Sequence, residues 1–186
     1  MIVINFQNIK TLYSAEKFLY RLEKEQYDID NIIIIPSIID IKDFKNKFKF
    51  KIGIPYSQNS EYITKKDMKN LNLFYALLNH KDNLIGYNSM YEAIKKLKNS
   101  NVRTITYSYN PSEYDKVRSL ESEYIVIKTN NINNISKFPI DTNDKVFIDY
   151  KFKNYNDIEK IDKFGIKGFI IKPYIKDFIL LKNYYL

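Results

Sequence analysis

The sequence predicts an α/β protein built on a parallel sheet, and three observations support this. Short apolar runs recur along the whole chain of 186 residues. Segments with helical spacing or with helix caps lie between most of them. Within the runs, consecutive residues are apolar, which is typical of strands buried on both faces. Such strands alternating with helices favour a sheet of parallel strands joined by right-handed crossovers.

Eight strands are expected from these runs. They cover residues 2–5, 32–35, 51–57, 73–78, 102–107, 124–128, 145–150 and 167–172. Pro36 closes the second run, because proline cannot donate a ladder hydrogen bond. Periodicity alone fits both an open doubly wound sheet and a closed eight-stranded barrel. The doubly wound fold would normally have a glycine-rich phosphate turn after the first strand, but residues 5–8 read Asn-Phe-Gln-Asn.

The first four helices are predicted from apolar spacing and from capping residues. The first presents Ala15, Phe18, Leu19 and Leu22 on one face, with Ser14 as a candidate cap. The next two cover residues 40–47 and 64–70. The fourth presents Met90, Ala93, Ile94 and Leu97 on one face. Ser89 and Glu92 at its start have the spacing of a capping box.

The last three predicted helices also carry end signals. Asn110 caps one helix, with Pro111 at its first position, where the missing N–H group costs nothing. Asn156 is the candidate cap of a helix that Gly165 ends. The final helix begins at about Lys176.

One crossover lacks a helical pattern. Residues 129–143 show no helical periodicity and lead directly into the seventh strand. We therefore expect the helix between strands six and seven to be missing. An uncovered pair of parallel strands would expose an apolar strip, which predicts a protein partner or a second copy of the chain on that side.

Composition indicates one globular domain spanning residues 1–186. The chain is 45% apolar and 16% aromatic, which is enough for a sizeable core. It has no cysteine and one histidine, so we expect neither disulfides nor a metal site, and nothing indicates a cofactor. No segment reads as a signal peptide or membrane span, so a cytoplasmic location without membrane association is expected.

The formal charge of +8 comes almost entirely from lysine. Only Arg21, Arg103 and Arg118 are arginines among 30 basic residues. Arginine makes most bidentate contacts to bases and phosphates. The lysines are spread along the chain, so we interpret them mainly as solvated surface residues and do not expect nucleic acid as a partner.

His80 is the first candidate site residue. It follows the apolar run 73–78 and forms a polar pair with Asn79. Polar residues at the carboxyl end of a buried parallel strand often carry the chemistry of α/β proteins. The competing interpretation is a hydrogen-bonded structural histidine.

Motifs from several strands resemble the compact archaeal triosephosphate isomerases. Residues 3–7 (VINFQ) are similar to the family's V-I-N-F-K, residues 77–83 (LLNHKDN) to L-L-N-H-S-E-N, and residues 124–128 (YIVIK) to Y-V-A-V-E. Shorter similarities lie at Ile35, Pro36, Asp40, Gln58, Asn110 and Pro111. The resemblance covers nearly the whole chain and implies a shortened (β/α)8 TIM-type barrel.

The resemblance implies an altered catalytic site. Asn5 and His80 match family residues, His80 as the neutral electrophile, and Asp82 stands where the family has glutamate. Gln7 replaces the family lysine, and Lys128 replaces the glutamate base. An ammonium group cannot abstract a proton, so isomerisation should fail.

Other family features are also lost. Residues 129–134 replace the lid, and residues 149–152 replace the phosphate-binding glycines after strand seven. The short connection at residues 58–64 lacks the loop through which family dimers interlock.

Three functions therefore stay open. The chain could be an inactive barrel kept for binding or assembly. It could be an enzyme acting on a small phosphorylated carbonyl compound, with residual isomerase activity or with Lys128 as a Schiff-base lysine, although Asp149 beside it would keep the amine charged. It could also bind a small phosphorylated or anionic ligand through a lysine cluster made of Lys128, Lys151, Lys153 and Lys172.

Overall fold

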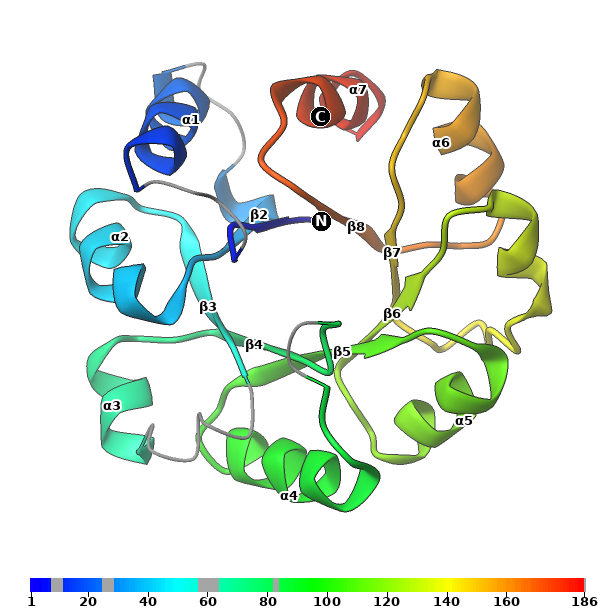
Figure 1. Cartoon of the computed structure of the whole chain (residues 1–186), viewed down its shortest axis with the longest axis horizontal. Helices are drawn as coiled ribbons and strands as arrows, with labels where there is room; N and C mark the ends of the chain where they lie inside the picture. The colour runs from blue at the N-terminus through cyan, green and yellow to red at the C-terminus, as the bar shows by residue number, and fades with distance from the viewer. Residues whose placement is uncertain (8–11, 25–28, 57–63, 82–83, 186) are drawn as a thin grey trace.

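The chain folds into a closed barrel of eight parallel strands in sequence order, as Figure 1 shows. This computed structural model describes residues 1–7, 12–24, 29–56, 64–81 and 84–185. The strands are β1 (Ile2–Asn5), β2 (Ile32–Ile35), β3 (Lys51–Pro55), β4 (Tyr75–Leu78), β5 (Arg103–Ser108), β6 (Tyr124–Lys128), β7 (Val146–Asp149) and β8 (Gly168–Ile171). Pairing of β1 with β8 closes the sheet, so the barrel prediction is confirmed and the open doubly wound alternative is wrong.

Helices surround the barrel (Figure 1). They are α1 (Leu12–Lys24), α2 (Ile41–Lys47), α3 (Lys65–Asn70), α4 (Tyr87–Lys98), α5 (Pro111–Ser119), α6 (Tyr155–Asp162) and α7 (Ile175–Tyr185). Short 3₁₀ turns occur at η1 (Ile29–Asn31), η2 (Ile38–Asp40) and η4 (Ile132–Lys137). Among the described helices, none is long and apolar enough to cross a membrane.

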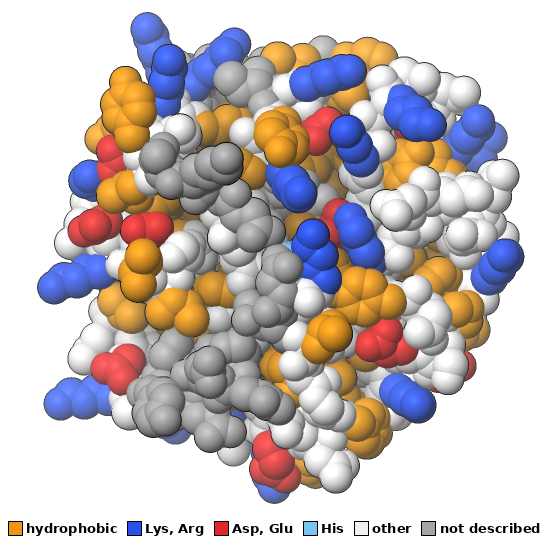
Figure 2. All heavy atoms as spheres, viewed as in Figure 1, with side chains coloured by type: hydrophobic (Ala, Val, Ile, Leu, Met, Phe, Trp, Pro, Cys, Tyr) orange, Lys and Arg blue, Asp and Glu red, His pale blue; other side chains and the backbone are white. Residues whose placement is uncertain are grey.

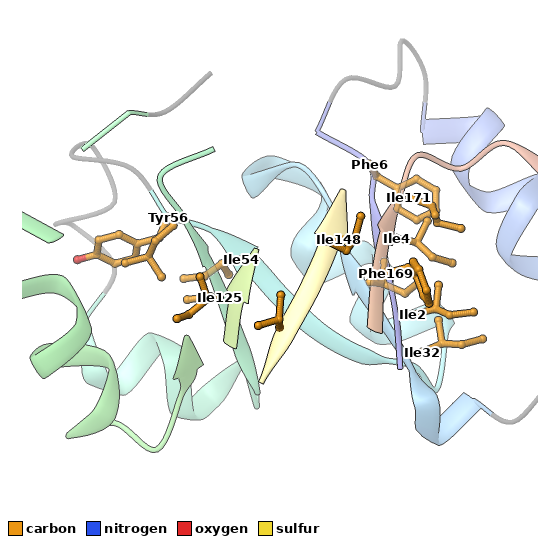
Figure 3. Close-up of a cluster of buried hydrophobic side chains, with 14 of the residues drawn as sticks. Ile2, Ile4, Phe6, Ile32, Ile54, Tyr56, Ile125, Ile148, Phe169 and Ile171 are labelled. Atoms are coloured by element: carbon orange, nitrogen blue, oxygen red, sulfur yellow. The ribbon is translucent and has the colours of Figure 1, made fainter. Parts of the chain in front are cut away.

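Strand alternation divides the core into two layers. One cluster contains only strand residues, such as Val3, Ile33 and Phe147, and fills the barrel. The larger cluster joins the outer faces of the strands to helix residues such as Phe18 and Leu19. Figure 3 shows part of this outer layer, with ten of its members labelled: Ile2, Ile4, Phe6, Ile32, Ile54, Tyr56, Ile125, Ile148, Phe169 and Ile171.

One helix cap follows the sequence prediction, and the structure adds another at Thr64, which was predicted only as the start of a helix. The side chain of Asn110 accepts a hydrogen bond from the Glu113 N–H group, and Pro111 is the first residue of α5. Thr64 begins α3 with a full capping box, in which Asp67 returns a bond to the Thr64 N–H group.

Three predicted caps are wrong. Ser14 lies inside α1, which begins at Leu12. Ser89 lies inside α4, because the chain turns into that helix at the extended residue Gly86. Asn154 caps α6 instead of Asn156, because its extended backbone lets its side chain accept a bond from the Asp157 N–H group at 3.3 Å.

The crossover from β6 to β7 has no α-helix, as predicted, but it is not bare. The 3₁₀ turn η4 lies there, and its residues Ile132 and Ile135 are buried together with Phe138. Phe138 also packs edge-on against Tyr114 of α5, with ring centroids 5.9 Å apart. The outward residues of β6 and β7 are buried beneath this segment. The expected exposed strip is therefore absent from this described region, and a partner on this side stays a prediction.

Candidate functional site

The carboxyl ends of β5, β6 and β7 bring three polar side chains together inside the barrel mouth. Lys128 and Asp149 are neighbours in the β6–β7 register. The Lys128 Nζ atom lies 2.6 Å from Asp149 Oδ1. The Tyr107 hydroxyl donates a hydrogen bond to the other carboxylate oxygen, Oδ2, at 2.9 Å. Asp149 is thus held by a separate donor on each of its two oxygens.

Tyr107 is the buried centre of this network. Its side chain is 1% exposed. Burial, followed by the charge of Asp149, raises the pKa of the Tyr107 phenol well above its usual value, so the hydroxyl stays a donor at neutral pH. The His80 ring packs edge-on against the Tyr107 ring at 5.1 Å, and Tyr109 stacks on it at 5.9 Å.

The polar pair after β4 divides into two roles. Asn79 adopts a positive φ of 55°, a conformation that asparagine tolerates better than most residues. Its amide nitrogen donates to the Tyr107 carbonyl at 3.1 Å and to Glu113 at 2.8 Å. Its amide oxygen accepts from the Ile85 N–H group. Asn79 therefore fixes the loop before α4, while His80 turns to the barrel mouth.

A small cavity lies beside His80 at the side where β8 meets β1. Its volume is about 80 Å³, and its lining residues are Asn5, His80, Asp149, Ile170, Ile171, Lys172, Pro173 and Tyr174. Typical ligand pockets hold about 300–1,000 Å³, so this cavity is small for a ligand site. Figure 2 shows lysine and arginine side chains near the centre of the barrel on the face drawn.

Asn5 and Gln7 brace one another at the end of β1. The Asn5 amide nitrogen donates to the Gln7 side-chain oxygen at 3.2 Å, and the Gln7 N–H group donates to the Asn5 side-chain oxygen at 3.0 Å. Asn5 also shares a side-chain hydrogen bond with Tyr107. Asn5 thus links the cavity wall to the buried network, and Gln7 orients Asn5 without lining the cavity.

The structure separates the four lysines of the predicted cluster. Lys172 lines the cavity, whereas the Lys128 ammonium group is engaged by Asp149. Lys151 and Lys153 are exposed and are not among the cavity residues. The charge of Lys151 acts on Asp177.

Some predicted features cannot be placed. Ser57, Gln58 and Asp82 lie outside the described residues. Where the resemblance puts the family's lid, Thr129 and Asn131 form a local turn, with the Thr129 hydroxyl donating to the Asn131 carbonyl at 2.8 Å. This turn leads into η4.

Sequence reasoning missed Tyr107 as a site residue and weighed Asp149 only as a neighbour of Lys128. A usable signal was present. In β5 the alternate residues Ile105 and Tyr107 point into the barrel, and in β7 Phe147 and Asp149 do the same. Period-two counting therefore identifies the last inward residue of each strand.

These features define a (β/α)8-barrel protein with a small polar cavity at the carboxyl end of the barrel, the end at which barrel enzymes bind their ligands. Within the described ranges, no group of three or more histidine, aspartate or glutamate side chains could hold a metal ion. No protein-family model matches the chain, and no curated protein sequence matches it.

Proposed function

We propose that this barrel is a divergent relative of triosephosphate isomerase that does not isomerise triose phosphates and instead binds a small anionic ligand in the cavity beside His80. The observation that carries the first part is the ion pair between Lys128 and Asp149 at 2.6 Å. Motif similarity to the isomerase family supports the relationship, and the barrel fold is compatible with it.

Isomerisation requires a carboxylate that accepts a proton from carbon. Lys128 stands where the resemblance puts that carboxylate. Asp149 is the only carboxylate among the described cavity residues and is therefore the one candidate to replace it. Its oxygens already accept from the Lys128 ammonium group and the Tyr107 hydroxyl. These two donors occupy one lone pair on each oxygen and hold the carboxylate toward β5 and β6.

The same ion pair disfavours an aldolase. A Schiff-base lysine must attack as the neutral amine. Here the Lys128 Nζ atom is engaged in a hydrogen bond to Asp149 and is not directed at a substrate carbonyl.

Ligand binding is supported by the composition of the cavity wall. Lys172 contributes a positive charge, and Asn5 and His80 contribute hydrogen-bonding groups. The paired charges of Lys128 and Asp149 cancel, so Lys172 decides the sign of the ligand.

A coupled assay with dihydroxyacetone phosphate and glyceraldehyde 3-phosphate tests the loss of isomerisation. We expect the purified chain to give no rate above the uncatalysed background, and His80→Gln to give the same result. Turnover at enzymatic speed that His80→Gln abolishes would contradict the proposal.

Borohydride trapping tests the enzymatic alternative. The chain is incubated with dihydroxyacetone and borohydride, and Lys128 is examined by peptide mass spectrometry. We expect no reduced adduct. An adduct at Lys128 that is missing in Lys128→Met would favour a carbonyl-processing enzyme over a binding protein.

A further inference from the structure

A second hollow lies near the amino ends of β7 and β8, at the opposite end of the barrel from the mouth. It is a groove between residues 135–142 of the β6–β7 crossover and residues 163–167 after α6, and its volume is about 610 Å³. This volume is within the range of about 300–1,000 Å³ that is typical of ligand pockets. Of the described crossovers, only the one from β6 to β7 has no α-helix (Figure 1). The groove therefore borders the thinnest part of the outer layer.

The floor of the groove is apolar. Ile135 is fully buried and Phe138 is 8% exposed, and both belong to the outer core layer. Ile140 on the crossover wall and Phe164 on the α6 wall are only partly buried and pack against the same layer. Both walls thus present apolar side chains that a partner could cover.

The wall on the α6 side is basic, and its backbone is fixed. Lys163 directly follows α6, and Gly165 has a positive φ of 70°, which is typical of glycine after a helix. The Lys167 N–H group donates to the Val146 carbonyl at 2.8 Å. Both lysines are exposed, and neither forms an ion pair with another described residue. Two ammonium groups are therefore available at the edge of the apolar floor.

The crossover wall has one carboxylate, and its own loop engages it. Asp141 Oδ1 accepts from the Asn143 N–H group at 3.1 Å and from the Thr142 hydroxyl at 3.2 Å. These bonds, the one from Asn143 most, lower the pKa of Asp141. With two lysines and one aspartate, the lining of the groove has a net positive charge.

We infer that this groove binds an acidic segment of a partner protein, with large apolar side chains on its floor and carboxylates at Lys163 and Lys167. Charge complementarity favours this occupant over a second copy of the chain, because each copy has a formal charge of +8. A nucleic acid would use the lysines through its phosphates and leave the apolar floor uncovered. The groove is separate from the cavity beside His80, so this inference does not depend on anion binding there.

Fluorescence anisotropy with the full chain tests this inference at neutral pH and physiological ionic strength. Two short labelled peptides serve as probes, with equal numbers of glutamates and with either leucine and phenylalanine or serine at the other positions. We expect saturable binding of the apolar peptide and at least about tenfold weaker binding of the serine peptide. Lys163→Glu/Lys167→Glu should weaken binding of the apolar peptide at least about tenfold.

A matched variant controls for net charge. Lys65→Glu/Lys95→Glu makes the same change of charge at exposed positions of α3 and α4, which lie across the barrel from α6 in Figure 1. Peptide binding to this variant should weaken less than about twofold, because salt screens distant exposed charges. Both charge variants should keep the urea midpoint of the wild-type chain, so that a loss of binding reports on the groove and not on unfolding.

Several results would contradict the inference. It is wrong if the apolar peptide does not bind, or if the two peptides bind equally, because the apolar floor would then have no role. Equal weakening by the two charge variants would mean nonspecific attraction. Tighter binding of a labelled oligouridylate than of the apolar peptide would assign the groove to nucleic acid. A dimer in light scattering that Ile140→Asp dissociates would assign it to a second copy of the chain.

Discussion

The two sides of the barrel mouth use their polar residues differently. On the side of β5, β6 and β7, Tyr107, Lys128 and Asp149 satisfy one another in a closed network. On the side where β8 meets β1, Lys172 and Asn5 form the wall of a small cavity, which Asp149 of the network also borders. The difference teaches that a polar residue at a strand end is a candidate ligand-binding residue only when its side chain lines a cavity. Substitutions in the network should change stability, whereas those in the cavity wall should change binding.

The largest effect is expected from removing the centre of the network. Tyr107→Ala should lower the free energy of unfolding by about 3–5 kcal/mol, because a fully buried aromatic ring and its hydrogen bond are both lost. Tyr174→Ala, at a side chain that is 57% exposed, should change it by no more than about 0.5 kcal/mol. Urea unfolding measures both. Equal losses for the two variants would mean that the two sides do not differ as described.

A second prediction uses the ionisation of Tyr107. Its pKa is raised in the folded state, mainly by burial and then by Asp149. Below pH 10 the phenol is neutral in both states. Above pH 10 the unfolded chain releases this proton while the folded chain keeps it, so the free energy of unfolding falls by about 1.4 kcal/mol per pH unit for this group. The stability contributed by the neutral phenol is therefore present at neutral pH and is lost in alkaline solution.

In Tyr107→Phe, the free energy of unfolding should fall less steeply with pH above pH 10, by about 1.4 kcal/mol per pH unit, because one titrating proton is removed. Tyr13→Phe is the control, because that ring is 73% exposed and meets solvent in both states. Urea unfolding at pH 10.0, 10.5 and 11.0 gives the slopes. An unchanged slope in Tyr107→Phe would show that the phenol is not held neutral by the network.

Within the network, loss of the ion pair should have a smaller effect on stability than loss of Tyr107. Lys128→Met leaves Asp149 bound by Tyr107 alone and should cost about 1–2 kcal/mol. This value lies below that of a fully buried pair because the side chains are 31% and 21% exposed and solvent screens the charges. Lys172→Met should change stability by at most about 0.5 kcal/mol. If Lys172→Met lowered the free energy of unfolding more than Lys128→Met, Lys172 and not Lys128 would be the lysine that stabilises the fold.

Much of the barrel could be predicted from the sequence because its strands are continuous apolar runs. Periodicity could not predict closure, since closure depends on pairing of β1 with β8, for example of Ile2 with Phe169 across most of the chain; only the motif resemblance pointed to a barrel. The segment that covers β6 and β7 was not predicted, because its apolar residues do not follow the α-helical period. Ile132, Ile135 and Phe138 are spaced by three, the period of a 3₁₀ turn.

The site was harder to predict because each contact depends on a local backbone angle. The positive φ of Asn79 sends its side chain toward α5 and leaves His80 at the cavity. Asn154 and Asn156 are equally good capping residues by type, and only the extended conformation of Asn154 selects it. Tyr107 needed no such information, because counting alternate residues along β5 places it inside the barrel mouth.

The most direct measurement follows the imidazole of the only histidine during an acetate titration. His80 lines the cavity, so histidine-labelled protein gives a single ring signal at the proposed site. We predict a saturable shift of the His80 Cε1–H resonance in the wild-type chain and at least about tenfold weaker binding in Lys172→Met. No shift at any acetate concentration, or the same titration curve in Lys172→Met, would contradict the account.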